Sequence, residues 1–562
     1  MQIWKRIMKG SGNQKLVQGF FVIALLLVGV FFFFRPTITS GFKSMQSDPG
    51  DTVFNNYVLE HSFLTVFDKS YNASAWSPSF FYPQPNVLTY GDNIWGAAPF
   101  YWLARIFFPP DTSFQVWMII VLSLSFISFY FLARKLKANI WFSAITAFIF
   151  AFGLSRMGQV GHQQLMPHFF APMALLFLFR FIDNRKIYNL FLFEIFLYLQ
   201  LLAGIYLGWF FILSMAVFIP ITLIHYDDKK KLRAFFTPWA IFSYAALFFI
   251  LAVTFQPYHL AQKEFGKRPY YEVKTMIPQL TSYFTVSPSS IFYDFYPELM
   301  KEAADRLPMK WEHQLFLGFF LICLVFASLA SLYFSRPDKK VYKLVELPPV
   351  FLLSLTAFLI ITIISFQFKF IDYSFWKHIY DFFPGAGAIR AATRVWLASY
   401  LFLLLAIASL SSFAFSRSKL IIKIVLVSLG LLACLEQIDL RPYYFNKIEY
   451  RKVQSELNSV VTQGIEKTGA EAFYLHWLTD DPSFYYYQLI AMWSGITLNK
   501  PVINGYSGQK PPKYQNIRVP LQSDGLRLWL ARYSLEEKTV LLIEASVKDG
   551  GLLVFRSYAL PK

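Results

Sequence analysis

Long apolar runs recur along this 562-residue chain, and they constrain its fold more than any other feature. A helix that rises about 1.5 Å per residue needs about 20 apolar residues to cross the hydrocarbon core of a bilayer. Eleven runs approach that length: 16–34, 114–133, 139–155, 164–182, 187–204, 206–225, 235–255, 314–335, 347–368, 395–415 and 420–437. The sequence therefore predicts a polytopic α-helical membrane protein with eleven transmembrane helices. The fifth and sixth runs are almost continuous, which leaves the count open there.

Basic residues between these runs indicate the topology, because cytoplasmic loops carry an excess of Lys and Arg. Alternate loops hold these residues: Arg134, Lys135 and Lys137; Arg185 and Lys186; Lys229, Lys230, Lys231 and Arg233; Arg336, Lys339, Lys340 and Lys343; Arg417 and Lys419. The alternation predicts a cytoplasmic N-terminus and a C-terminal segment outside the membrane. The first run follows Lys5, Arg6, Lys9 and Lys15 and lacks a small-residue cleavage pattern, so we interpret it as a retained span.

Composition argues against several other classes of protein. The chain is 56% hydrophobic and 15% charged, whereas soluble domains have about 25% charged residues. Its net charge of +18 lies in short loop clusters rather than in basic patches interleaved with aromatic residues, so no nucleic-acid partner is expected. Cys323 and Cys434 both lie inside apolar runs, which excludes a disulfide framework and a cysteine-rich metal site.

The chain divides into two predicted domains. Residues 1–440 form the transmembrane domain, with long outer loops at 36–113, 256–313 and 369–394, and residues 441–562 form a small extracytoplasmic α/β domain. The α/β prediction rests on alternating apolar patterns mixed with helix-like stretches after residue 450. In the first long loop, apolar positions within 52–67 predict an amphipathic interfacial helix, and the apolar stretch 96–108 is too short to span the membrane.

Acidic residues of the first long loop are the leading catalytic candidates. Asp48 and Asp51 flank Pro49-Gly50, immediately before the predicted interfacial helix. A carboxylate at the membrane surface can accept a proton from a sugar hydroxyl or bind a divalent cation through hard oxygen ligands. The same tetrapeptide is also a good turn, in which either aspartate serves only as a helix cap. Asp92, later in this loop, is open to the same two interpretations.

Polar residues of the later loops are candidates for binding a substrate. His162 lies in a tight turn, where it orients a substrate, binds a phosphate or makes an ordinary interfacial hydrogen bond. Arg390 and Arg394 are four residues apart, so we expect them on one helical face, where two guanidinium groups suit a phosphate. General anchoring to lipid headgroups is the alternative. Arg268 is either a further phosphate contact or a solvated charge, and Glu312 is a further titratable group.

Two other observations restrict the function. No Walker loop, dinucleotide fingerprint, zinc-ligand spacing or nucleophile elbow is present, and the second half of the chain does not repeat the first, as it does in many transporters.

Glu194 lies inside the fifth run, where a charged residue costs about 3 kcal/mol, so we expect it to contact a partner inside the bundle.

The arrangement resembles the membrane glycosyltransferases of the C-type fold (GT-C), and it is similar to largely uncharacterised bacterial multi-span members of that superfamily. The matching pieces are Gly50-Asp51, Phe81-Tyr82-Pro83, Gly161-His162-Gln163, Pro257-Tyr258, Pro384-Gly385 with Arg390 and Arg394, and residues 502–508 with Pro511. The chain departs at Ala391-Ala392-Thr393, where that group usually has a Val-Pro-Ala-like stretch. The resemblance implies a catalytic carboxylate after the first span, here Asp51 or Asp48. Some members use a divalent cation, and Mg²⁺ or Mn²⁺ at Asp48 and Asp51 stays open here.

The leading hypothesis is an inverting glycosyltransferase of the bacterial cytoplasmic membrane. It would move a sugar from a polyprenyl-phosphate donor to an extracytoplasmic glycan, lipid or protein acceptor. Asp51 or Asp48 would be the base, and Arg390 and Arg394 would neutralise the leaving phosphate. The expected cavity lining is Asp92, His162, Arg268 and Glu312, with Tyr506 as a sugar platform. The alternatives are a transporter or flippase of a lipid-linked intermediate and a non-catalytic envelope scaffold. Convergence of the candidate residues on one cavity would favour the enzyme.

Overall fold

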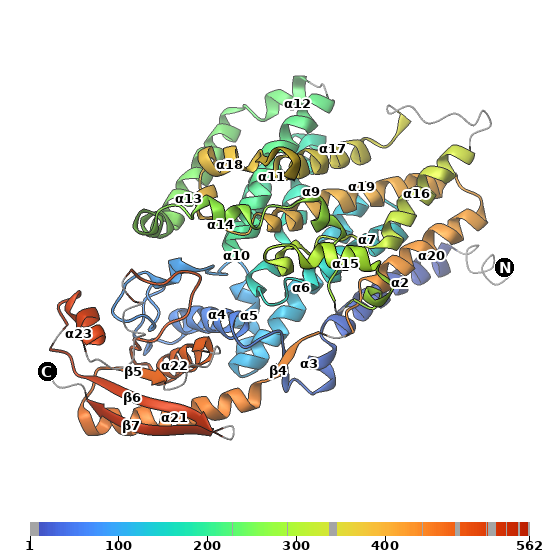
Figure 1. The fold of residues 1–562 in the computed structure, drawn as a ribbon. Helices are drawn as coiled ribbons and strands as arrows, with labels where there is room; N and C mark the ends of the chain where they lie inside the picture. The colour runs from blue at the N-terminus through green and yellow to red at the C-terminus, as the bar shows by residue number, and fades with distance from the viewer. Residues whose placement is uncertain are drawn as a thin grey trace.

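A computed structural model shows a bundle of long helices with a small sheet at one end (Figure 1). The structure describes residues 11–226, 229–288, 290–335, 346–440, 442–477, 484–512, 514, 524–535, 537–548 and 551–559. The predicted cytoplasmic charges Lys5, Arg6, Lys9, Arg336, Lys339, Lys340 and Lys343 lie outside these ranges.

A helix occupies each of the eleven apolar runs. Seven of the described helices are long and apolar enough to cross a membrane: α2 (Ser11–Phe33), α6 (Pro110–Lys135), α7 (Ile140–Phe152) continued by α8 (Leu154–Met157), α9 (Phe170–Asn184) preceded by η2 (Gln163–Leu165), α11 (Ile205–Tyr226), α13 (Pro238–Phe265) and α19 (Val395–Arg417). The other four are α10 (Ile187–Ala203), α16 (Phe319–Phe334), α17 (Pro349–Ile364) and α20 (Leu420–Glu436), each shorter than 18 residues. These lengths and compositions fit a helical membrane protein, and eleven crossings remain a prediction.

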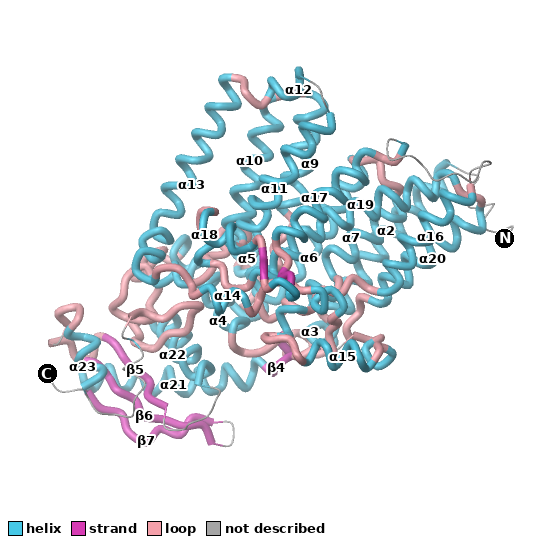
Figure 2. Tube along the Cα trace, turned by 45° about the horizontal axis from the view of Figure 1, so that its top comes forward, coloured by secondary structure: helices cyan, strands magenta, loops and turns pink. Residues whose placement is uncertain are grey.

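Two apolar helices show how differently the bundle uses similar sequences. The most apolar window of α19 is 89% buried between α7, α11, α16 and α17, and its small residues allow close contacts, such as that between Ser411 and Ser328 of α16. The equivalent window of α13 is only 11% buried, and α13 stands at the edge of the bundle (Figure 2). Glu194 of α10 accepts a hydrogen bond from Ser243 of α13 at 2.9 Å, so the expected partner is present.

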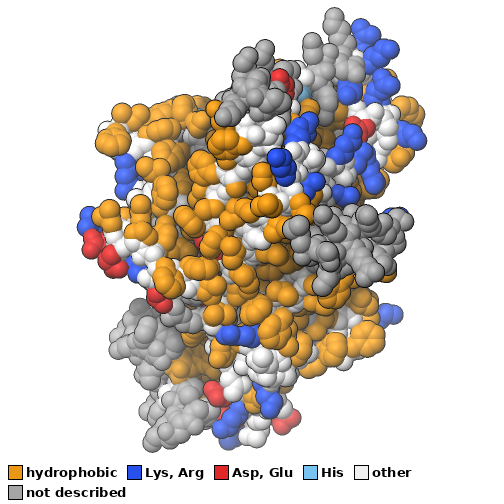
Figure 3. Space-filling view, turned by 90° about the vertical axis from the view of Figure 1, so that its right-hand side faces the viewer, with side chains coloured by type: hydrophobic (Ala, Val, Ile, Leu, Met, Phe, Trp, Pro, Cys, Tyr) orange, Lys and Arg blue, Asp and Glu red, His pale blue; other side chains and the backbone are white. Residues whose placement is uncertain are grey.

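The predicted cytoplasmic loops that the structure describes, at 134–137, 185–186, 229–233 and 417–419, gather at one end of the bundle. Lys135 pairs with Asp183 at 2.8 Å, and both line a cavity together with residues 348–350 and Ser416. The loop after α11 joins the same end, because Phe235, just after α12 (Lys229–Ala234), packs its ring on Phe181 of α9. Figure 3 shows a broad hydrophobic surface with many Lys and Arg side chains gathered toward the top of the view. This gathering is the arrangement that the charge alternation predicts for loops on one side of a membrane.

The helix predicted over 52–67 is present as α4 (Asp51–Phe67), but the prediction that it is interfacial was wrong. Residues 52–62 are all buried, and the polar residues among them have partners inside the protein. Glu60 pairs with Arg105 at 2.9 Å, and Asn56 donates to Asp111 at 2.9 Å. The apolar pattern could not reveal that a distant segment, α22 (Phe484–Leu498), also packs against this helix.

The C-terminal segment has the predicted mixture of helices and strands. β5 (Ala472–Trp477) pairs in parallel with β6 (Val540–Lys548), which pairs antiparallel with β7 (Gly551–Ala559). The helix α21 (Lys447–Thr468) packs on this sheet, and α22 and α23 (Asp524–Ala531) complete the segment (Figure 1). We call residues 442–559, as far as they are described, the C-terminal module.

The C-terminal module is built together with the first long loop. Backbone hydrogen bonds join Tyr82 to Val502 and Val502 to Ser79, at 3.0 and 2.9 Å. Arg451 of α21 forms a two-pronged ion pair with Asp111 of α6, at 2.5 and 2.6 Å. A short ladder of β1 (Ser44–Gln46) and β4 (Tyr444–Asn446) adds a further link. These contacts fix the module against the loop that carries Asp51 and Asp92.

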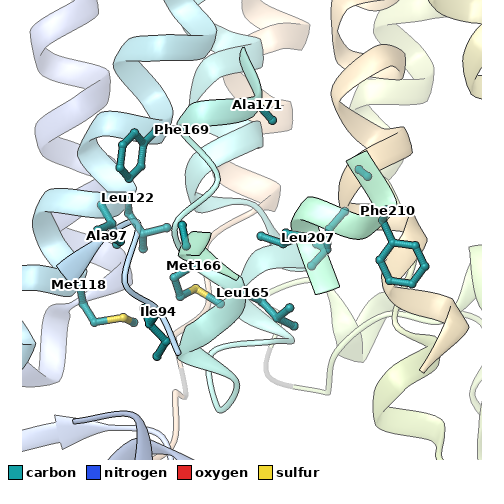
Figure 4. Packing of buried hydrophobic residues seen from close by; sticks show 14 of the residues in the cluster. Ile94, Ala97, Met118, Leu122, Leu165, Met166, Phe169, Ala171, Leu207 and Phe210 are labelled. Carbon is teal, nitrogen blue, oxygen red and sulfur yellow. The ribbon is translucent and has the colours of Figure 1, made fainter. Parts of the chain in front are cut away.

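The second and third long loops carry short helices. These are α14 (Tyr270–Lys274), α15 (Glu298–Asp305) and α18 (Trp376–Phe382). The second long loop is shorter than predicted, because α13 continues to Phe265 rather than ending at residue 255. Likewise α9 begins at Phe170, so the turn with His162 extends further than expected. Figure 4 shows Leu165 and Met166 of this turn packed beside Ile94, with Leu207 and Phe210 of α11 on their other side.

Candidate functional site

One cavity of about 450 Å³ lies where the long loops meet the ends of α11 and α13. Six of the nine predicted site residues line it: Asp51, Asp92, His162, Arg268, Arg390 and Arg394. Glu312 and Tyr506 lie directly behind this lining, bonded to Arg394 and Asp51 respectively. The ninth residue, Asp48, does not line the cavity. Its carboxylate accepts hydrogen bonds from the Gly50 amide at 2.7 Å and from Ser47 at 3.2 Å. Asp48 therefore has the turn-forming role that was its structural alternative.

Asp51 begins α4, and both of its carboxylate oxygens are bonded. Oδ2 lies 2.7 Å from Nδ1 of His162, and Oδ1 accepts a hydrogen bond from the Tyr506 hydroxyl at 2.6 Å. Burial alone would raise the pKa of Asp51, but His162, then Tyr506 and the charge of Arg394, outweigh it and lower this pKa. The carboxylate is therefore ionised at neutral pH, and 27% of the side chain stays exposed.

The turn that carries His162 is fastened to α4. Gln163 donates to Thr52 at 2.6 Å and accepts from Asn55 at 3.0 Å, and these bonds set His162 beside Asp51. The other ring nitrogen, Nε2, lies 3.6 Å from Glu312. Burial and the charge of Arg394 would lower the pKa of His162, but Asp51 and Glu312 outweigh them and raise it, which favours the imidazolium form.

Glu312 and Arg394 complete the charged network. Arg394 donates to both carboxylate oxygens of Glu312, at 2.6 and 3.0 Å, and the two side chains are only 3% and 7% exposed. Burial would raise the pKa of Glu312, but Arg394 and then His162 hold it well below its ordinary range. Asp51, His162, Glu312 and Arg394 therefore form one continuous chain of opposite charges across four separate segments.

The prediction that Arg390 and Arg394 share a helical face was wrong. The backbone is extended at Ile389, which separates η8 (Ala386–Ala388) from η9 (Ala392–Arg394). The Arg390 amide donates to the Tyr206 hydroxyl at 3.0 Å. The i, i+4 spacing brings side chains together only where the helix is continuous. The two arginines nevertheless line the same cavity, one near its surface and one buried.

Residues 63–441 match the family that is described as a domain of unknown function, DUF6311. The chain belongs to the DUF6311 family. The matched part contains Asp92, His162, Arg268, Glu312, Arg390 and Arg394, whereas Asp51 and Tyr506 lie on either side of it. No curated protein matches the chain.

Within this DUF6311 chain, Asp92 caps a helix and is also a cavity residue. Its Oδ1 accepts the backbone N–H of Ile205 at 2.5 Å, so it caps the start of α11, and it also lines the cavity. Burial raises the pKa of Asp92 to about 6. Asp92 therefore gains a negative charge only as the pH approaches neutrality, in contrast to Asp51.

Aromatic side chains that sequence reasoning missed form much of the cavity wall. Trp209 of α11 donates to the carbonyl of Pro384 at 2.8 Å, and Tyr258 of α13 donates to that of Gly91 at 2.9 Å. Tyr206 and Phe265 also line the cavity. Inside apolar runs such residues look like any other membrane-facing aromatics, and only Tyr258 had a signal, in the Pro257-Tyr258 match.

The part of the chain that the structure describes does not form a metal site. Among the described residues, no group of three His, Cys, Asp or Glu side chains is arranged to hold a metal ion. The two candidate ligands are also committed differently, since Asp48 bonds the Gly50 amide and Asp51 bonds His162 and Tyr506. The carboxylates of Asp48 and Asp51 are thus each held by protein groups.

Proposed function

We propose that this protein is an inverting glycosyltransferase that uses a polyprenyl-phosphate sugar and an acceptor on the far side of the membrane from its N-terminus. The observation that carries the proposal is that an ionised carboxylate, Asp51, shares one cavity with Arg390 and Arg394. A base and cationic groups in one cavity are what displacement of a phosphate by a hydroxyl requires.

In the proposed reaction the acceptor hydroxyl gives its proton to Asp51. Its oxygen attacks the anomeric carbon from the face opposite the phosphate, the bond from that carbon to the phosphate oxygen breaks, and the electron pair leaves with the phosphate. Each carboxylate oxygen has two lone pairs, so Asp51 can receive this proton while keeping its bonds to His162 and Tyr506. Arg390 and Arg268 are the arginines best exposed to bind the leaving phosphate.

The position of α13 supports a lipid-linked donor. Phe255, Tyr258 and Phe265 of this helix line the cavity, whereas Phe248 and Phe249 are 75% and 68% exposed on its outside. One helix therefore separates the charged cavity from an apolar surface that suits lipid. A prenyl chain along this side would leave its phosphate near Arg390.

The proposed location is the bacterial cytoplasmic membrane, with the N-terminus inside and the C-terminal module outside. Reporter fusions test this topology. A reporter that works only outside should be active after Lys562, and one that works only inside should be active after Lys230 and Lys340. A cytoplasmic C-terminus would mean an even number of spans, and α10 and α11 would be the place to revise.

The decisive test of the reaction compares Asp51→Asn with Asp48→Asn. Mass spectrometry of envelope glycans and glycolipids from a deletion strain first identifies the missing sugar, and the variants are then expressed in that strain. Loss of a general base lowers a rate by about 10² to 10⁴, so Asp51→Asn should abolish the product at normal membrane abundance. Asp48→Asn should be tolerated, because Asn forms the same turn.

Full product from both variants at normal abundance would remove the base from the mechanism. The transporter or scaffold alternatives would then become the better explanations of the cavity.

A further inference from the structure

Tyr506 of the C-terminal module contacts Asp51, one of the residues that line the cavity. Its hydroxyl lies 2.6 Å from Oδ1 of Asp51, although the two residues are 455 positions apart in the chain. Burial, and then the negative charge of Asp51, raises the pKa of Tyr506, so the phenol keeps its proton. The hydroxyl is therefore the donor and the carboxylate the acceptor.

Tyr506 is held in place by the module itself. The Asn504 side chain accepts from the Leu475 amide at 2.7 Å and donates to the Leu475 carbonyl at 2.9 Å, which ties this segment to β5. The Gly505 amide donates to Gln488 of α22 at 3.1 Å. Gly505 also has no room for a side chain, because a Cβ there would lie 2.2 Å from the Phe81 ring. The Tyr506 hydroxyl thus has a position set by β5, α22 and the first long loop.

We propose that Tyr506 is a positioning residue for Asp51, and that the C-terminal module is therefore part of the catalytic centre rather than a separate acceptor-binding domain. The inference rests on the proposed function, in which Asp51 is the base. With His162 on one oxygen and Tyr506 on the other, the plane of the carboxylate is fixed. The module also supplies Gly508, whose carbonyl accepts from Arg268 at 3.2 Å at the cavity wall.

A second role for Tyr506, as an aromatic platform for a sugar, makes a different prediction. A platform needs the ring and not the hydroxyl. Tyr506→Phe keeps the ring, including its edge-to-face contact with Phe54 at 5.6 Å between centroids, and removes only the bond to Asp51. This substitution therefore separates the two roles.

The experiment measures the rate of the full-length protein in membranes against pH, for wild type, Tyr506→Phe and Tyr57→Phe. Tyr57 is the matched control, because its buried hydroxyl bonds Ser79 at 2.9 Å and lies outside the cavity lining. Tyr506→Phe should lower kcat about tenfold with little change in the donor KM. Its acidic limb should move to higher pH, because Asp51 loses a bond that lowers its pKa. Tyr57→Phe should change neither kcat nor the pH profile.

A second variant keeps the test decisive if Tyr506→Phe accumulates poorly. Site-specific 3-fluorotyrosine in place of Tyr506 retains the hydroxyl and strengthens its donation, so the acidic limb should move to lower pH. An acidic limb at the wild-type pH in every 506 variant that accumulates would overturn the inference. If Asp51→Asn abolishes product while the Tyr506 variants behave as wild type, the positioning role fails and the proposed function stands. If Asp51→Asn keeps full product, the proposed function itself fails.

Discussion

Arg394, the inner arginine, and Arg390, the outer arginine, both line the cavity, but carboxylates hold them differently. Arg394 is 7% exposed and binds both oxygens of Glu312, at 2.6 and 3.0 Å. Arg390 is 42% exposed, and its nearest carboxylate oxygen, on Glu272, lies 3.6 Å away. Arg268 approaches the same Glu272 oxygen at 3.9 Å.

This difference indicates separate roles for two arginines, although the sequence analysis gave both of them the same role, phosphate binding. A buried ion pair is costly to break from one side, because the remaining charge is left without water or partner. A loose, partly exposed pair adds little stability and leaves its guanidinium donors available. We therefore expect Arg394 to hold the frame of the cavity and Arg390 to bind the ligand.

The largest expected effect is on the inner pair. Glu312→Ala strands Arg394 in the interior and should lower the free energy of unfolding by about 3–5 kcal/mol. Glu272→Ala, the outer control, should change it by about 1 kcal/mol or less. Thermal unfolding of both purified variants in the same detergent checks the comparison. Equal melting temperatures would contradict the distinction between inner and outer pairs.

The ion pair of Glu312 and Arg394 should also make the stability of the protein depend on pH. The folded-state pKa of Glu312 is depressed from its ordinary value of 4.5, so its stabilising contribution is fully present above that value. This contribution should be lost as the pH falls below 4.5 toward the folded-state pKa, and the wild type should lose stability there more steeply than Glu312→Gln.

Asp92 should show the opposite sign, because burial outweighs the charge of Arg394 and raises its pKa. Its pKa is raised from 3.8 to about 6, so the folded protein binds the extra proton and stability falls as the pH rises through this window. Asp92→Asn keeps an oxygen to cap α11 and should be more stable than wild type by about 1–3 kcal/mol above pH 6. Below about pH 4 the two proteins should unfold alike. A constant difference at every pH would show that the charge of Asp92 is not its cause.

A smaller effect is expected for the outer arginine. Arg390→Ala should weaken binding of a short-chain prenyl phosphate about tenfold and leave the melting temperature unchanged. Arg390→Lys should restore only part of the affinity, because Lys supplies charge without the planar fork. Calorimetric titration in detergent measures both variants. Unchanged affinity in Arg390→Ala would remove this residue from phosphate binding.

The smallest effect concerns the carboxylate between the outer arginines. Glu272 competes with a phosphate for Arg390 and Arg268, so Glu272→Gln should tighten binding of the same prenyl phosphate by about two- to fivefold. Weaker binding would mean instead that Glu272 orders the arginines for the ligand.

The sequence by itself determined the positions of the apolar helices and the sharing of one end by the basic loops that the structure describes. Both follow from local quantities, the length of an apolar run and the charge of the segment that follows it. Hydropathy did not reveal which helices are central. The windows of α13 and α19 have mean hydropathies of 1.9 and 2.0, yet they are 11% and 89% buried.

Only the tertiary structure decided how the candidate residues are used. The sequence named Asp51, His162, Glu312 and Arg394 separately, but their order in one charged network depends on contacts between segments more than 80 residues apart. It also predicted a helical pair for Arg390 and Arg394 and an interfacial position for α4. Both failed for the same physical reason: local spacing fixes the direction of a side chain within a helix, whereas packing against distant segments decides whether that helix is continuous and what covers it.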